Sequence, residues 1–62
     1  MPQQLLLPNG EYIGWQRILP RGRWTPVVGG ATEREASLKL FALPLEGGRQ
    51  LEMITLRKDR RP

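Results

Sequence analysis

Apolar residues recur at helical spacing in one segment of the chain, residues 31–45. Thr32 followed three residues later by Glu35 forms a capping box, which marks the start of a helix. Pro44 marks its end, because proline cannot continue the helical hydrogen bonds and disfavours the helical conformation of the residue before it. The pattern therefore predicts one helix over residues 31–45.

The predicted helix carries two apolar stripes on roughly opposite sides. The first consists of Ala36, Leu40 and Leu43, and the second of Leu38, Phe41 and Ala42. One small sheet covers only one stripe, so we expect the first to pack on the sheet. The second is then covered either by the terminal segments or by another subunit, with Leu38 and Phe41 as the interface residues.

The chain before the helix has short apolar runs that end at two related turns. Residues 7–10 and 19–22 both have the sequence L-P-x-G. Proline favours the first central position of a type I turn, and glycine tolerates the left-handed conformation that follows. Two such turns predict two consecutive hairpins, and hence a three-stranded antiparallel meander over residues 3–7, 11–19 and 23–28.

Two strands of this meander have informative side chains. In the middle strand Ile13, Trp15, Arg17 and Leu19 share one face, because side chains alternate along a strand. In the next strand Pro26 has no amide hydrogen to donate. That strand therefore lies at an edge of the sheet, or turns Pro26 outward.

Residues 50–56 predict one more strand after the helix. The apolar residues of this strand do not alternate cleanly, since Leu51 and Met53 share one face whereas Ile54 and Leu56 share the other. The pattern suggests either a β-bulge or burial on both faces.

The predicted order of elements is strand, strand, strand, helix, strand. It indicates an α+β fold, in which a three- to four-stranded antiparallel sheet has one helix packed on one face and leaves the other face open. A chain of 62 residues makes one small domain, which we place at residues 1–56. Residues 57–62 are expected to be a disordered basic tail.

The composition excludes several classes of site. The chain has no cysteine and no histidine, so disulfides and zinc fingers are excluded and the commonest catalytic base is missing. Among its carboxylates, Glu33 and Glu35 suit the helix N-terminus, and Asp59 lies in the tail. We therefore expect a protein that is not an enzyme and has no cofactor, no metal site and no small-molecule ligand.

Apolar runs in this sequence fall far short of the roughly 20 residues that a membrane helix needs. The first residues also lack the basic leader and long apolar core of a secretory signal. We expect a cytoplasmic protein with no membrane partner.

The net charge of +4 is concentrated near the C-terminus. Residues 57–61 hold four basic side chains and one acidic one, and so carry +3. A basic excess favours polyanionic partners through counterion release, although it also serves solubility.

The second predicted hairpin is the best candidate for a binding site. It places three guanidinium groups and two indoles around one turn: Trp15, Arg17, Arg21, Arg23 and Trp24. A β-ribbon of this width can enter a major groove, where arginine bonds phosphate or guanine and tryptophan stacks on an unpaired base. The alternative is that both tryptophans belong to the core and that residues 21–23 form a solvated turn.

Residues 22–24, G-R-W, and residues 32–36, T-E-R-E-A, also carry a resemblance. Together with the three predicted strands before the helix, they resemble the Apetala-type plant DNA-binding domain and the arm-binding N-terminal domain of phage integrases. The resemblance implies a sheet that lies in the major groove, with Trp15, Arg17, Arg23 and Trp24 on DNA. It also implies that Ala36 and Leu40 pack the helix on the sheet.

The sequence thus favours a small non-enzymatic domain that binds nucleic acid, DNA rather than RNA, through its open sheet face and this hairpin. The alternative is a small protein-interaction or self-association module, in which Leu38, Phe41 and the last strand form a homodimer contact.

Overall fold

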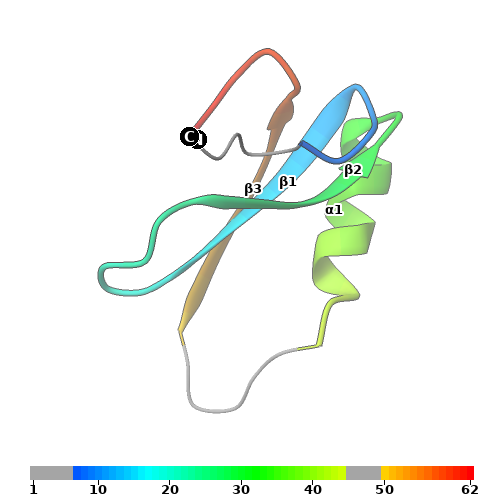
Figure 1. Ribbon diagram of the computed structural model, residues 1–62. Coiled ribbons are helices and arrows are strands. Elements are labelled where there is room, and N and C mark those ends of the chain that lie inside the picture. Colours follow the sequence, from blue (N-terminus) through cyan, green and yellow to red (C-terminus); the bar gives the residue numbers. More distant parts are fainter. Residues whose placement is uncertain (1–6, 45–49) are drawn as a thin grey trace.

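The computed structural model describes residues 7–44 and 50–62. These residues form the elements β1 (Tyr12–Ile18), β2 (Thr25–Gly30), α1 (Glu33–Phe41) and β3 (Leu51–Arg57). The three strands form one antiparallel sheet in the order β2-β1-β3, and α1 packs against it (Figure 1). The expected α+β fold is confirmed.

The sheet differs from the predicted meander in the strand that lies beside β1. β3 follows α1 in the chain and pairs with all of β1, from Tyr12 opposite Arg57 to Ile18 opposite Leu51. Both edges of β1 are therefore occupied, by β2 and by β3. The strand expected at residues 3–7 falls mainly on residues 1–6, outside the described part of the chain, and Leu7 is in no strand.

β2 is an edge strand, the first of the two alternatives that Pro26 left open. Its pairing with β1 is irregular, because Gly14 lies opposite Val28 whereas the next residue, Trp15, lies opposite Pro26. Val27 is the extra residue of this bulge. For residues 50–56 the sequence left open a bulge or burial on both faces. The β1–β3 register is regular and has no bulge. β3 instead has half-buried residues on both faces, Met53 and Leu56 among them.

α1 lies against the centre of the sheet at Gly14. A Cβ atom at this glycine would lie 2.6 Å from Leu40 Cγ and 2.6 Å from Val28 Cγ2. Thr55, opposite Gly14 on β3, shares this face, and its hydroxyl is hydrogen-bonded to that of Ser37 on α1 at 3.0 Å. The missing side chain of Gly14 thus allows the close approach of α1.

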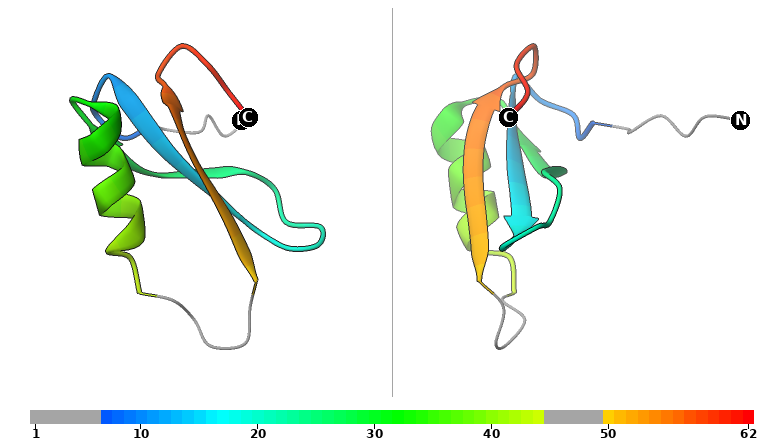
Figure 2. Two further views of the ribbon diagram at one scale, coloured as in Figure 1. Left: turned by 180° about the vertical axis from the view of Figure 1, so that it is seen from behind. Right: turned by 90° about the vertical axis from the view of Figure 1, so that its left-hand side faces the viewer.

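The sheet face away from α1 is covered at its centre. Ile13 and Trp15 alternate with Gly14 and so lie on this face, yet they are only 1% and 3% exposed. Gly29, opposite Ile13, lies so close to Asn9 that a Cβ atom would collide with the Asn9 carbonyl oxygen. In Figure 2 the segment that precedes β1 lies on one side of β1, and α1 lies on the other side. The expectation of a fully open face is therefore wrong.

The start of α1 follows the capping-box prediction with one difference. Thr32 is the N-cap, and its hydroxyl accepts a hydrogen bond from the Glu35 amide at 3.1 Å. The Glu35 carboxylate in turn accepts from the Ala31 amide at 2.9 Å, one residue earlier than in the usual capping box.

The helix ends at Phe41 and not at residue 45, so the predicted helix was too long. Ala42 is the C-cap, and the Leu43 amide donates to the Leu40 carbonyl at 3.2 Å, which tightens the last turn. The helix therefore stops before Pro44 begins to constrain Leu43.

The two stripes of α1 have different environments. Ala36 and Leu40 are buried against the sheet, at 0% and 3% exposure. Leu38 and Phe41 are 58% and 74% exposed, so no described residue covers the second stripe. No helix in the described part of the chain is long and apolar enough to cross a membrane.

Replacing Gly14 with alanine should separate α1 from β1, because the new methyl group overlaps Leu40 and Val28. We expect a loss of about 1–3 kcal/mol in the free energy of unfolding, as for other overpacked cores. Urea denaturation measures it. The exposed Thr25→Ala change serves as the control and should stay within about 0.5 kcal/mol of the parent; equal stability of the two variants would contradict this packing.

The carboxyl of Glu35 should contribute to the pH dependence of stability. The Ala31 amide, and after it the Lys39 ammonium group 3.5 Å away, lower the pKa of Glu35. Because the folded pKa lies below the unfolded one, this stabilisation is present above about pH 4.3 and is lost as the pH falls through the folded pKa. Urea midpoints measured from pH 6 to pH 2 should therefore fall less in Glu35→Gln than in the parent.

The control for this measurement is Glu33→Gln, which removes a neighbouring carboxylate that makes no hydrogen bond to the Ala31 amide. The urea midpoint of this variant should fall between pH 6 and pH 2 by as much as that of the parent. The same fall in all three proteins would show that Glu35 contributes nothing.

Candidate nucleic-acid interface

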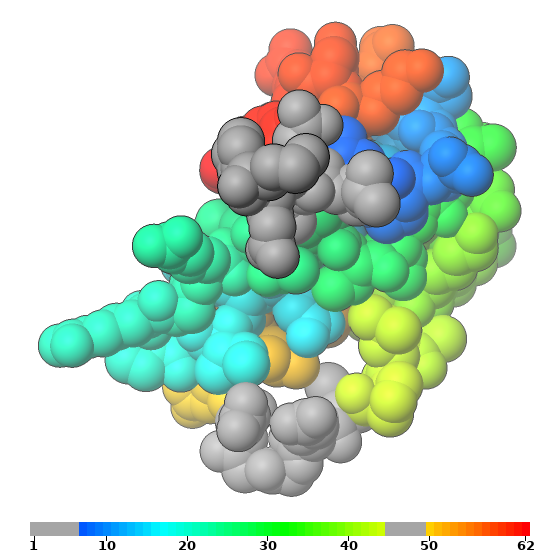
Figure 3. All heavy atoms as spheres, viewed as in Figure 1, coloured from blue at the N-terminus to red at the C-terminus, as the bar shows by residue number. Residues whose placement is uncertain are grey.

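The loop between β1 and β2 projects from the body of the domain on the side away from α1 (Figures 1 and 3). The Gly22 amide donates to the Ile18 carbonyl at 2.6 Å, and the Leu19–Pro20 peptide bond is cis. This hydrogen bond closes a turn of five residues, 18–22. The four-residue type I turn expected over residues 19–22 is therefore not formed.

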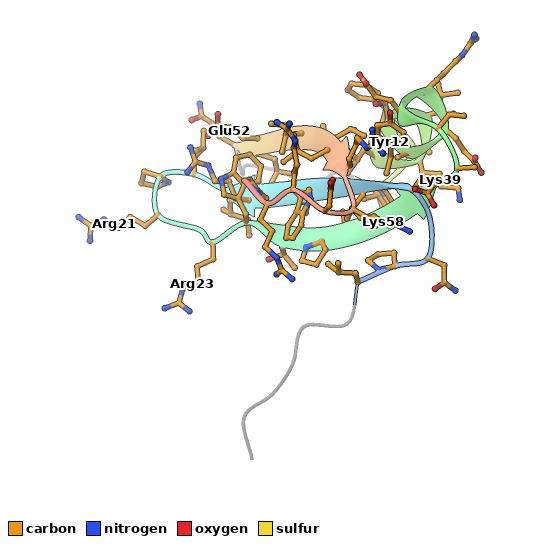
Figure 4. The ribbon with its side chains drawn as sticks, turned by 90° about the horizontal axis from the view of Figure 1, so that it is seen from above. Tyr12, Arg21, Arg23, Lys39, Glu52 and Lys58 are labelled. Atoms are coloured by element: carbon orange, nitrogen blue, oxygen red, sulfur yellow. The ribbon has the colours of Figure 1, made fainter. Side chains whose placement is uncertain are left out.

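Arg21 and Arg23 lie at the end of this loop. Both are exposed, and Figure 4 shows their side chains directed away from the sheet. Neither forms an ion pair with another residue in the described ranges 7–44 and 50–62. Residues 12–32 contain three arginines and no acidic residue, so the loop has a positive potential that nothing nearby in the sequence offsets.

Arg17 lies at the base of the loop and makes two contacts. Its guanidinium group pairs with the carboxylate of Glu52, the residue opposite it on β3, with Nε 2.7 Å from Oε1. The same group lies over the ring of Trp24, with Cζ 4.8 Å from the centroid. Arg17 thus links the sheet to the loop and is less available to a ligand than Arg21 or Arg23.

The two tryptophans have different environments. Trp24 is half-buried beside Arg17, whereas Trp15 is 3% exposed and belongs to the core. The indole N–H of Trp15 is buried without a hydrogen-bond partner in the described part of the chain. The structure therefore agrees with the core interpretation for Trp15, because a base cannot stack on a ring that is covered.

Sequence reasoning missed the role of Glu52 because it lies 35 residues from Arg17. Their contact depends on the register of β1 and β3, and the meander prediction gave that side of β1 to residues 3–7. Only the pairing of β3 with β1 would have revealed it.

A second basic region lies at the other end of β1. Arg57 lies opposite Tyr12 at the start of β1. Tyr12 is six residues from Ile18, so about 20 Å of strand separates this end from the loop. The Lys58 amide donates to the Glu11 carbonyl at 2.9 Å, and its Nζ lies 3.1 Å from the Glu11 carboxylate. Arg60 and Arg61 follow and are exposed. The disorder expected for residues 57–62 stays a prediction, although Lys58 extends the pairing of β3.

Another surface feature lies between α1 and β3. It is a groove of about 300 Å³ with seven lining residues: Glu33, Ser37, Leu40, Phe41, Met53, Ile54 and Thr55. No three acidic side chains gather in residues 7–44 and 50–62 in a way that could hold a metal ion.

Comparison with known proteins does not assign the chain to a family, because no family model, curated protein or solved structure matches it. The resemblance to the plant and phage DNA-binding domains extends to a three-stranded antiparallel sheet with one helix. It does not extend to the order of the elements, because β3 follows α1 here.

Replacing Arg17 with alanine should loosen the loop while leaving the core intact. We expect a loss of about 0.5–2 kcal/mol in the free energy of unfolding, from the cation–π contact together with an exposed ion pair. Acrylamide should also quench the fluorescence of Trp24 more strongly, since one face of its ring is uncovered.

The matched variant is Arg17→Lys, which keeps a cation beside Glu52 and Trp24 and should show weaker quenching than the alanine variant. Trp24→Phe isolates the signal of the buried Trp15, which should change little when Arg17 is also replaced. Unchanged quenching in Arg17→Ala would show that the stack does not persist in solution.

Proposed function

We propose that this protein is a small non-enzymatic domain that binds nucleic acid, preferentially DNA, through the loop between β1 and β2. The observation that carries the proposal is the exposure of Arg21 and Arg23 at the end of a projecting loop, within a stretch of 21 residues, 12–32, that contains no acidic side chain. A cytoplasmic location is part of the proposal and rests on the sequence alone.

The two loop arginines would contact phosphate oxygens. A guanidinium group offers paired donors that match a phosphate. When it binds, the nucleic acid releases counterions, and this release supplies affinity that does not depend on base sequence. The loop is narrow enough to follow a groove of the duplex. Base contacts would come from the same two side chains where the loop enters the groove.

Arg17 and Trp24 would act by supporting the loop. Their stack and the ion pair with Glu52 tie the base of the loop to the sheet. A loop that is ordered before binding loses less conformational entropy on the ligand. The binding surface is therefore the loop, whereas the sheet face that the resemblance implied holds the buried Ile13 and Trp15.

The proposal predicts that Arg21→Ala/Arg23→Ala weakens binding to a short mixed-sequence duplex. Each phosphate contact contributes about 0.9 to the slope of log Kobs against log salt concentration, so losing two should reduce that slope by about 1.8. Fluorescence anisotropy of a labelled duplex, recorded between low and moderate salt, gives both the affinity and the slope.

The matched control is Arg60→Ala/Arg61→Ala, which removes the same charge from the C-terminal end. It should retain most of the parent's affinity and slope. If this control loses affinity while the loop variant does not, the binding belongs to the C-terminal residues and the proposed site is wrong. If the parent protein does not bind the duplex even at low salt, the proposed function is wrong.

A further inference from the structure

The outer edge of β3 presents backbone groups that pair with no other strand in the described part of the chain. The Leu19 amide donates to the Gln50 carbonyl, and the Lys58 amide to the Glu11 carbonyl. Antiparallel pairing alternates, so even-numbered residues of β3 direct their N–H and C=O groups toward β1. The odd-numbered residues direct theirs outward: Leu51, Met53, Thr55 and Arg57. No strand in the described ranges pairs with this edge, although the Arg57 carbonyl accepts a hydrogen bond from the Arg60 amide at 2.9 Å.

The two edges of the sheet differ in how well they are protected. β2 has Pro26 and a bulge, two features that prevent a further strand from pairing. β3 runs for seven residues in regular register, with no proline and no bulge. An edge of this length without a proline or a bulge is suited to accept another strand.

Exposed apolar side chains lie beside this edge. Phe41 is 74% exposed and lines the groove between α1 and β3, and Ile54 on β3 is 37% exposed. Exposed apolar side chains beside an unpaired strand indicate a contact surface.

We propose that β3 pairs antiparallel with β3 of a second copy of this chain, across a two-fold axis at Thr55. The result is a continuous six-stranded sheet with both α1 helices on the same face. The nucleic-acid proposal rests on Arg21 and Arg23, which are not part of this junction, whereas Glu52 lies in the junction and also holds Arg17 at the base of the loop. The two proposals are therefore tested separately.

The charge pattern of β3 favours a second copy in this orientation. An acidic residue, Glu52, lies near the start of the strand, and the basic residues Arg57 and Lys58 lie at its end. An antiparallel copy brings opposite charges together, whereas a parallel copy would place like charges side by side.

The axis at Thr55 also matches individual side chains. Because the axis is perpendicular to the sheet, each face continues into the same face of the second copy. Ile54 then lies opposite Leu56 of the second copy, and Glu52 opposite Lys58. Symmetry doubles both pairs, so the face away from α1 gains two apolar contacts. Glu52 and Lys58, which pair with Arg17 and Glu11 in the single chain, then also lie opposite a residue of opposite charge.

The same register fills the groove. Met53 lies opposite Arg57 of the second copy, and Phe41 lines the groove beside Met53. The Phe41 ring therefore covers the side chain of that arginine. The two-fold axis repeats this contact at the other end of the junction, between Phe41 of the second copy and Arg57 of the first.

A single cysteine tests the register, because the chain has none of its own. In a hydrogen-bonded pair the two Thr55 Cα atoms lie about 5.5 Å apart, within the span of a disulfide. Thr55→Cys, oxidised at micromolar concentration without nucleic acid, should form a covalent dimer on a non-reducing gel. Met53→Cys lies on the same face and edge, but its two copies are more than about 13 Å apart and should not cross-link.

Sedimentation equilibrium supplies an independent measurement. The parent protein should be a dimer, and Phe41→Lys should shift it toward monomer with an unchanged far-UV circular dichroism spectrum, since Phe41 is exposed in the single chain. A parent protein that stays monomeric at millimolar concentration overturns the proposal. Cross-linking of Met53→Cys as efficient as that of Thr55→Cys overturns it as well.

Discussion

The close approach of α1 to β1 at Gly14 is the constraint on which the rest of the fold depends. Both neighbours of this glycine, Leu40 on α1 and Val28 on β2, occupy the space that a side chain would fill. The helix can therefore bury Ala36 and Leu40 with only nine residues. A short helix is marginal by itself in water, so its stability comes from this packing and from the Thr32 cap.

The opposite face of β1 imposes a second constraint, which decides what the surface can do. Ile13 and Trp15 are buried there, and Arg17 continues the same face to the base of the loop. Since Glu52 and Trp24 hold the Arg17 side chain, the positive charge that is free for a ligand moves to Arg21 and Arg23. The burial of a hydrophobic face thus displaces a candidate binding surface from the sheet to the loop.

The sequence was sufficient for features whose signals are local. The Thr32–Glu35 box located the helix start, and apolar spacing identified Ala36 and Leu40 as core. Pro26 limited its strand to an edge or to an outward-turned proline, and the strand is at an edge. The sequence failed where a contact joins distant segments. Residues 50–56 were recognised as a strand, but nothing local showed that they pair with β1, and the Arg17–Glu52 contact follows only from that pairing. Local signals also overstated the helix, because Pro44 sets a limit and does not require the helix to reach it.

The unequal edges of the sheet connect these observations. β1 is fully paired because β3 returns to it from the far end of α1, and this return leaves β3 outermost. A chain of 62 residues buries a smaller fraction of its surface than a larger domain does, so it has few residues left to cover a second edge of the sheet. Pro26 and the bulge protect β2 and lie directly beside the contact of Gly14 with Val28. β3 has no equivalent device, and the residues that would carry one, Met53 and Thr55, face α1 and line the groove beside it. The side chains that complete the contact with α1 are therefore the ones that leave this edge unprotected.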